Sequence, residues 1–152
     1  MSITQTEKAA RFRALHDGPG AFVIPNPWDI SSARILAGLG FQALATSSAA
    51  SASALGRRDG GLTRDEVLAH ARLIVDATDL PVSADLEKGF GDAPEAVAET
   101  IRLAAAAGLV GCTIEDATGN PDRPLYDASL AVERIAAAAQ AARALRNTKL
   151  LQ

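Results

Sequence analysis

The segment from Pro81 to Gly91, PVSADLEKGFG, constrains the fold more than any other part of the chain. Its residues alternate between apolar and polar, and in a β-strand this alternation places the two kinds on opposite faces. Asp85 and Glu87 then share one face near the end of the strand, and glycines follow them. The pattern predicts a strand with one face packed against helices and two carboxylates on the face toward a polar cavity.

Apolar runs of strand length alternate with helical patterns along the whole chain. We expect strands over residues 21–25, 41–46, 81–87 and 109–115. We expect helices at the N-terminus and over residues 32–39, 63–77, 92–107 and 129–146. Strands that alternate with helices indicate a parallel sheet with right-handed crossovers, so the predicted fold class is α/β.

Local signals place two helix starts and two long loops. Thr63, followed by Glu66, has the spacing of a capping box, and Asp92 is expected to cap the next helix, with Pro94 in its first turn. The loops are rich in small or turn-forming residues and cover residues 47–61 and 117–127. Loops of this length are uncommon in compact domains and are often functional.

The composition limits the class of protein. A chain of 152 residues suits one domain, and a net charge of −3 argues against a nucleic-acid-binding protein. The chain has no apolar run of about 18 residues, the minimum for a membrane span, and its N-terminus lacks the apolar segment of a signal peptide. We therefore expect a soluble cytoplasmic protein. The single cysteine, Cys112, cannot form an internal disulfide and is expected to be a core thiol.

Acidic residues lie at or just after the carboxyl ends of three predicted strands. They are Asp59, Asp85, Glu87, Glu115 and Asp116. In parallel α/β folds the functional site lies at the carboxyl ends of the strands, so several of these side chains are expected to converge there. Clustered carboxylates repel one another unless a cation lies among them, and Mg²⁺ prefers oxygen ligands. The alternative is that the acids cap helices or pair with nearby cations, namely Arg57, Arg58 or Lys88.

Five motifs together resemble the isocitrate lyase/phosphoenolpyruvate (PEP) mutase superfamily. They are PNPWD at residues 25–29, GFQALATSSAA at 40–50, LGRRDG at 55–60, PVSADLEKGFGD at 81–92 and GLVGCTIEDAT at 108–118. The resemblance extends over about residues 12–143. It implies a (β/α)8 barrel, a Mg²⁺ cofactor and a small oxyacid substrate. It also implies cleavage or formation of C–C or P–C bonds through enolate-like intermediates.

The resemblance further implies roles for individual residues. Asp85 matches the principal acid of the metal site, and Glu87 and Glu115 match two further acids of that site. Asp85 is also expected to take part in substrate binding. These three residues are therefore the metal ligands that the resemblance implies.

Small hydroxyl residues and one further acid complete the implied site. Ser47, with Thr46 and Ser48, lies where relatives bind the carboxylate or phosphonate of the substrate. Asp59 matches an acid in a loop that closes the site, and Asp59 and Ser47 are the candidate catalytic residues.

Three departures from the superfamily pattern narrow the hypothesis. The loop at 117–127 lacks the Lys-Lys-Cys-Gly-His motif of the lyases, which argues against an isocitrate or methylisocitrate lyase. Glu87 replaces the commoner aspartate, which favours the mutase-like or decarboxylase-like members. Only four strand–helix units are predicted, so residues 1–152 are expected to form a single domain equivalent to the N-terminal half of the barrel.

Two functional hypotheses follow. The first is a Mg²⁺-dependent enzyme that acts on a small 2-oxo or 2-hydroxy acid. The second is a non-catalytic, truncated relative that forms a structural half-barrel in an oligomer. Since an open half-barrel exposes strand edges and apolar helix faces, we expect a homo-oligomer under either hypothesis. An unrelated doubly wound ligand-binding domain is disfavoured, because such a fold would have a glycine-rich phosphate loop after the first strand and PNPWD is not one.

Overall fold

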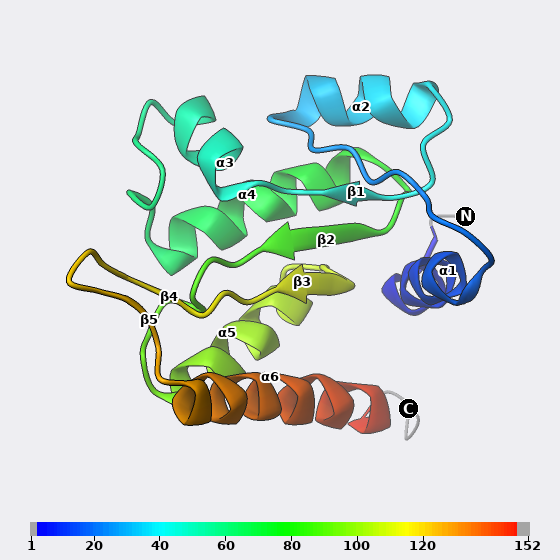
Figure 1. Cartoon of the computed structure of the whole chain (residues 1–152). Coiled ribbons are helices and arrows are strands. Elements are labelled where there is room, and N and C mark those ends of the chain that lie inside the picture. The colour runs from blue at the N-terminus through cyan, green and yellow to red at the C-terminus, as the bar shows by residue number, and fades with distance from the viewer. Residues whose placement is uncertain (1–2, 149–152) are drawn as a thin grey trace.

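A three-stranded parallel sheet lies at the centre of the computed structural model, which describes residues 3–148 (Figure 1). The strands are β1 (Leu44–Ala45), β2 (Val82–Asp85) and β3 (Gly111–Thr113), in the order β1-β2-β3. The register places Asp85 opposite Thr113. The predicted parallel α/β architecture is therefore confirmed, although each strand is shorter than its pattern predicts.

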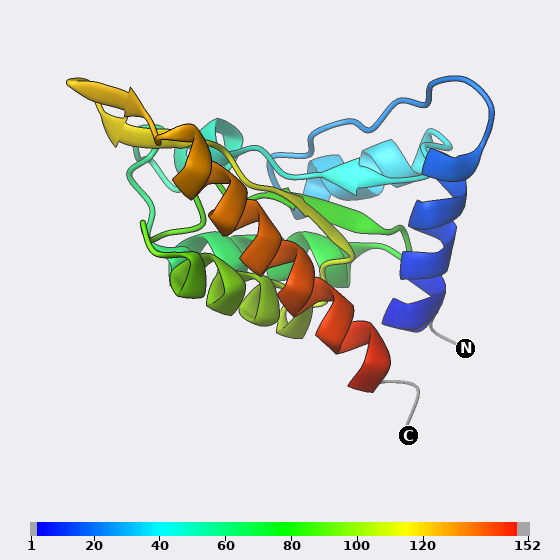
Figure 2. The same cartoon turned by 60° about the horizontal axis from the view of Figure 1, so that its bottom comes forward.

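Helices surround this sheet. They are α1 (Gln5–Asp17), α2 (Ile30–Gly38), α3 (Ser48–Ala54), α4 (Arg64–Ala77), α5 (Pro94–Ala106) and α6 (Ala128–Thr148). Figure 1 shows α1 near the end of the sheet at which the strands begin, and Figure 2 shows α6 lying against α5. No helix within residues 3–148 is long and apolar enough to cross a membrane.

The core lies between the sheet and the helices that cover it. Val82, Ala84 and Leu86 are at most 1% exposed, which confirms the apolar face predicted for the strand at residues 81–87. The facing residues come largely from α4, where Ile74 is fully buried. The capping box at the start of α4 is also confirmed, because the side chain of Thr63 accepts a hydrogen bond from the Glu66 N–H.

The N-terminal helix is tied to the rest of the fold by polar side chains. The Gln5 side chain donates to the carbonyl oxygens of Ala105 and Leu109, at 2.8 and 2.9 Å. The buried Lys8 donates through Nζ to the Thr78 carbonyl at 2.8 Å. The helix therefore lies against the end of the molecule opposite to the carboxyl ends of the strands (Figure 1).

The predicted strand at residues 21–25 is not formed. This segment has no regular structure but lies beside β1, where the Ala45 N–H donates to the Pro25 carbonyl at 3.1 Å. The Asn26 side chain adds a bond to the Ala45 carbonyl at 2.9 Å. Pro25 and Pro27 lack N–H groups, which limits the number of ladder hydrogen bonds that the segment can make.

Both predicted long loops contain regular structure. The first half of 47–61 is α3, because its alanines favour a helix and Ser47 caps it. The loop at 117–127 contains the antiparallel hairpin of β4 (Ala117–Asn120) and β5 (Arg123–Leu125). The Asn120 side chain accepts from the Asp122 N–H at 2.9 Å, which closes the turn between them.

Two predictions about single side chains are wrong. Asp92 does not cap α5: the cap position is Ala93, which offers no side-chain bond, while Pro94 occupies the first turn as expected. The Asp92 carboxylate instead accepts bonds from other parts of the chain, as described below. Cys112 is exposed rather than a core thiol, because β3 is an edge strand of the sheet.

Candidate active site

Asp85, the last residue of β2, is held in place by backbone groups from two segments. Its two carboxylate oxygens accept bonds from the N–H groups of Ser48, at 2.9 Å, and of Glu87, at 3.0 Å. Its own N–H donates to the Thr46 hydroxyl oxygen at 3.2 Å. These bonds fix the direction of the carboxylate, while each oxygen keeps acceptor capacity for a further ligand.

The Thr46–Ser48 segment lies beside Asp85 because β1 and β2 are neighbours in the sheet. Thr46 directly follows β1 and is 5% exposed, and its N–H donates to the Ser83 carbonyl at 3.0 Å. Ser47 is the N-cap of α3, but its hydroxyl accepts only a long bond of 3.4 Å from the Ala50 N–H. The structure thus brings together the hydroxyl segment and the acid that the sequence predicts to meet.

Glu87 has an unusual backbone and an unusual electrostatic environment. Its φ of +48° lies in the left-handed region, which is uncommon for a residue with a side chain. Burial raises the pKa of Glu87 above its ordinary value of 4.5. Three further negative charges also raise this pKa, and they belong to Asp85, Asp59 and Glu115. The four predicted acids are therefore electrostatic neighbours.

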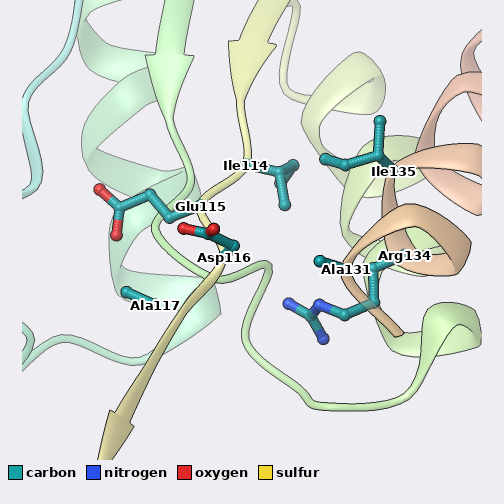
Figure 3. Close-up of a pocket in the computed structure, with 7 residues that line it drawn as sticks. All are labelled: Ile114, Glu115, Asp116, Ala117, Ala131, Arg134 and Ile135. Atoms are coloured by element: carbon teal, nitrogen blue, oxygen red, sulfur yellow. The ribbon is translucent and has the colours of Figure 1, made fainter. Parts of the chain in front are cut away.

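Glu115 and Asp116 follow β3 and line a cavity of about 470 Å³ next to α6. Apolar side chains of Ile114 and Ile135 form part of the same wall. Figure 3 shows Glu115 extending away from α6, whereas Arg134 projects from that helix toward the loop that follows β2. The Glu115 N–H donates to the Glu87 carbonyl at 2.8 Å, so the two strand ends are joined beside the acids.

The acids do not form a closed set of metal ligands. Within residues 3–148, no group of three or more His, Cys, Asp or Glu side chains lies close enough to hold an ion directly. Mg²⁺, however, often uses only one or two carboxylates and retains several waters. A half-buried carboxylate at Asp85, oriented by backbone hydrogen bonds and with acidic neighbours, fits that mode of binding.

The alternative reading, in which nearby cations pair with these acids, is not supported by the ion pairs of Arg57 and Lys88. Arg57 pairs with Glu66 at 3.1 Å, on the exposed side of α4. Lys88 pairs with Asp92 at 2.9 Å. Both cations thus make their ion pairs with other carboxylates, and the charge of Lys88 only partly offsets the burial and the negative charges that raise the pKa of Glu87.

Sequence reasoning missed the residues around Arg134. This arginine is only 1% exposed and packs over the ring of Tyr126, with its guanidinium carbon 4.1 Å from the ring centre. A charged residue inside the alanine-rich pattern of the last helix is the one sequence signal that could have indicated it.

Glu87→Gln is expected to change how stability depends on pH. Because the pKa of Glu87 is raised, the native state binds more protons than the unfolded chain at pH values just above 4.5. This group therefore makes the free energy of unfolding fall as the pH rises through that window. The glutamine variant lacks this loss, so its stability relative to the wild type should increase as the pH rises above about 4.5.

Urea unfolding at several pH values, without added metal, measures this difference. Glu133→Gln is the matched control, since Glu133 is exposed on α6 and its replacement should leave the pH profile unchanged. If the wild type and Glu87→Gln differ in free energy of unfolding by an amount that stays constant with pH, the raised pKa of Glu87 is contradicted.

A protein-family model matches most of the chain. The family model described as phosphoenolpyruvate phosphomutase matches residues 12–151. The chain belongs to the isocitrate lyase/PEP mutase superfamily. The resemblance seen in the sequence motifs is thereby confirmed, and the enzymes of this superfamily include lyases and mutases that act on small acids.

Three relatives show the extent of the similarity. A protein of Burkholderia cenocepacia J2315, provisionally described as a lyase/mutase, is 61% identical with a TM-score of 0.90, over 92% of this chain and 50% of that one. The 2,3-dimethylmalate lyase of Eubacterium barkeri is 39% identical over 110 residues, which are 71% of this chain and 38% of the lyase. Oxaloacetate acetylhydrolase with its product oxalate is 29% identical with a TM-score of 0.81, over 91% of this chain and 50% of that one. This superfamily member thus spans half or less of each relative.

Proposed function

We propose that this superfamily member binds Mg²⁺ and a small 2-oxo or 2-hydroxy acid at the carboxyl ends of its strands. The reaction is cleavage or formation of a C–C or P–C bond through an enolate-like intermediate. The observation that supports this proposal is the Asp85 carboxylate, which two backbone N–H groups fix beside Thr46, Ser47 and Ser48.

The metal site would consist of Asp85, Glu87 and Glu115, which act directly or through bound water. Support comes from the pKa of Glu87, which burial raises first and the charges of Asp85 and Glu115 raise further; a divalent cation among these carboxylates would relieve their repulsion. Bound Mg²⁺ would supply positive charge that stabilises negative charge developing on the oxyacid. The carboxylate of Asp85 is already oriented, so little reorganisation is needed on binding.

The substrate would lie against the Thr46–Ser48 segment. The Ser47 hydroxyl makes only a long bond as acceptor, so its proton is available to a carboxylate or phosphonate oxygen. Asp59, in the exposed loop between α3 and α4, is the second candidate catalytic residue. The negative charge of Asp59 contributes to the raised pKa of Glu87, so Asp59 lies near the acid cluster. This position is consistent with a role in closing the site and moving a proton.

We further propose that the described fold corresponds to half of a (β/α)8 barrel and that this chain functions in a homo-oligomer. Large apolar side chains are exposed on α2 and α6, at opposite sides of the sheet (Figure 1). They are Ile35 of α2 and Leu39 at its C-cap on one side, and Val132 and Ile135 of α6 on the other. The non-catalytic alternative is not favoured, because the named relatives are enzymes. The cytoplasmic location stays a prediction.

Calorimetric titration tests the proposed function. Oxalate, which mimics an enolate of a small oxyacid, is titrated into the purified chain with and without saturating Mg²⁺. We expect oxalate to bind only in the presence of Mg²⁺, and succinate, a dicarboxylate that cannot chelate in the same way, not to bind. A folded chain that gives no oxalate binding in saturating Mg²⁺ would contradict the proposal.

A further inference from the structure

A buried arginine on α6 holds the loop that follows the acidic strand. Arg134 donates through Nη1 to the carbonyl oxygens of Gly91, at 2.7 Å, and Asp92, at 2.6 Å. Its Nη2 donates to the carbonyl of Lys88. All three acceptors belong to the connection between β2 and α5, here named the β2–α5 loop (residues 86–93).

The aromatic ring of Tyr126 completes the surroundings of the guanidinium. The ring lies against the guanidinium plane, and its hydroxyl donates to the Asp92 carboxylate at 2.5 Å. Lys88 donates through Nζ to the same carboxylate at 2.9 Å and to the Thr118 carbonyl at 2.9 Å. The β2–α5 loop is thus connected both to α6 and to the hairpin of β4 and β5.

This loop needs such support because its backbone is strained. Glu87, Gly89 and Phe90 have φ values of +48°, +80° and +60°. Left-handed conformations cost free energy in residues with side chains, and they persist only where the surroundings enforce them. A second restraint comes from α5, where the buried Thr100 hydroxyl donates to the Gly89 carbonyl at 2.7 Å.

The chemistry of Arg134 suits restraint of a backbone better than simple packing. A buried cation is costly unless it is paired, and its bonded partners here are carbonyl oxygens rather than a carboxylate. The planar guanidinium can donate in several fixed directions at once, which a lysine ammonium on a flexible stem cannot reproduce. An apolar side chain would fill the same space without that cost.

We propose that Arg134 is a positioning residue for the candidate active site. It fixes the β2–α5 loop through the carbonyls of Lys88, Gly91 and Asp92, and so keeps Glu87 in the conformation that directs it into the acid cluster. The effect on ligand binding rests on the proposed function, whereas the restraint of the loop does not.

Arg134→Met tests the proposal, because it keeps a long side chain and removes the bonds. The matched control is Arg102→Met on α5, where the arginine side chain is 53% exposed and pairs with Glu99. Backbone hydrogen exchange and Mg²⁺-dependent oxalate affinity are measured at a temperature where both variants are folded. We expect exchange in the β2–α5 loop to rise at least about tenfold more than elsewhere, and affinity to fall by about tenfold, the lower range for residues that support metal ligands.

Arg134→Lys provides a second variant should the methionine variant fail to fold. It keeps the charge but loses the fixed geometry, so loop exchange should still rise and affinity should still fall. A folded variant with unchanged loop exchange, or with exchange raised uniformly and affinity intact, would overturn the proposal. If the wild type binds no oxalate, the proposed function fails, and loop exchange alone decides whether Arg134 positions the loop.

Discussion

Asp85→Asn is expected to lower the Mg²⁺-dependent affinity for oxalate by about 100-fold or more, since even residues that only support metal ligands contribute about 10–100-fold. The substitution preserves shape but removes the negative charge. It also places an amide N–H₂ group opposite one of two backbone donors, the N–H groups of Ser48 and Glu87. The variant therefore loses the negative charge of the ligand and one of the two bonds that orient it.

Calorimetry with the purified variant measures this effect, and circular dichroism checks that it is folded. Asp65→Asn is the matched control, because Asp65 is exposed in the first turn of α4. It should bind as the wild type does. Wild-type affinity in a folded Asp85→Asn variant would show that the ion, if bound, uses other groups.

Ile74→Ala is expected to lower the free energy of unfolding by about 2–5 kcal/mol, the usual cost of removing a large aliphatic side chain from a core. Ile74 is fully buried where α4 packs against the sheet. Its truncation removes apolar contacts and leaves a cavity, which surrounding side chains fill only in part. Urea unfolding followed by circular dichroism gives the value.

The neighbouring residue on the same helix offers a control. Leu73 is 53% exposed, so Leu73→Ala should change the free energy of unfolding by no more than about 0.5 kcal/mol. Similar losses in the two variants would mean that α4 does not bury the face described here. A loss confined to Ile74→Ala would support a core that is formed by the described residues themselves.

Features that depend on short sequence separations were predictable. The alternation in β2 identifies its buried face, because successive strand side chains point in opposite directions. The capping box of Thr63 and Glu66 identifies the start of α4, because its bonds join residues only three positions apart. Parallel order also follows from the alternation of strands and helices.

Features that depend on distant partners were not predictable from local pattern. Asp92 has the right spacing to cap α5, but Lys88 and the distant Tyr126 compete for its carboxylate. The hairpin after β3 requires pairing between two segments that each resemble a loop. Local sequence patterns therefore failed where the structure depends on a tertiary contact, such as the bond from Tyr126 to the Asp92 carboxylate.

The candidate site divides in the same way. The acids could be named because strand ends converge at one edge of a parallel sheet, whereas the Thr46–Ser48 segment was named through the family resemblance. The role of Arg134 could not, since its three carbonyl partners lie 42 to 46 positions away in the chain. Likewise, the burial and the neighbouring negative charges that raise the pKa of Glu87 depend on tertiary contacts that the sequence does not contain.

Paramagnetic relaxation by Mn²⁺, which shares the octahedral oxygen coordination of Mg²⁺, tests the central claim most directly. Mn²⁺ and oxalate are added to the isotope-labelled chain, and the broadening of each backbone amide signal is recorded. We predict selective broadening at residues 46–48, 85–88 and 115–116, with α1 unaffected at the opposite end of the sheet. Broadening centred elsewhere, or none in a folded sample, would contradict a metal site at the ends of these strands.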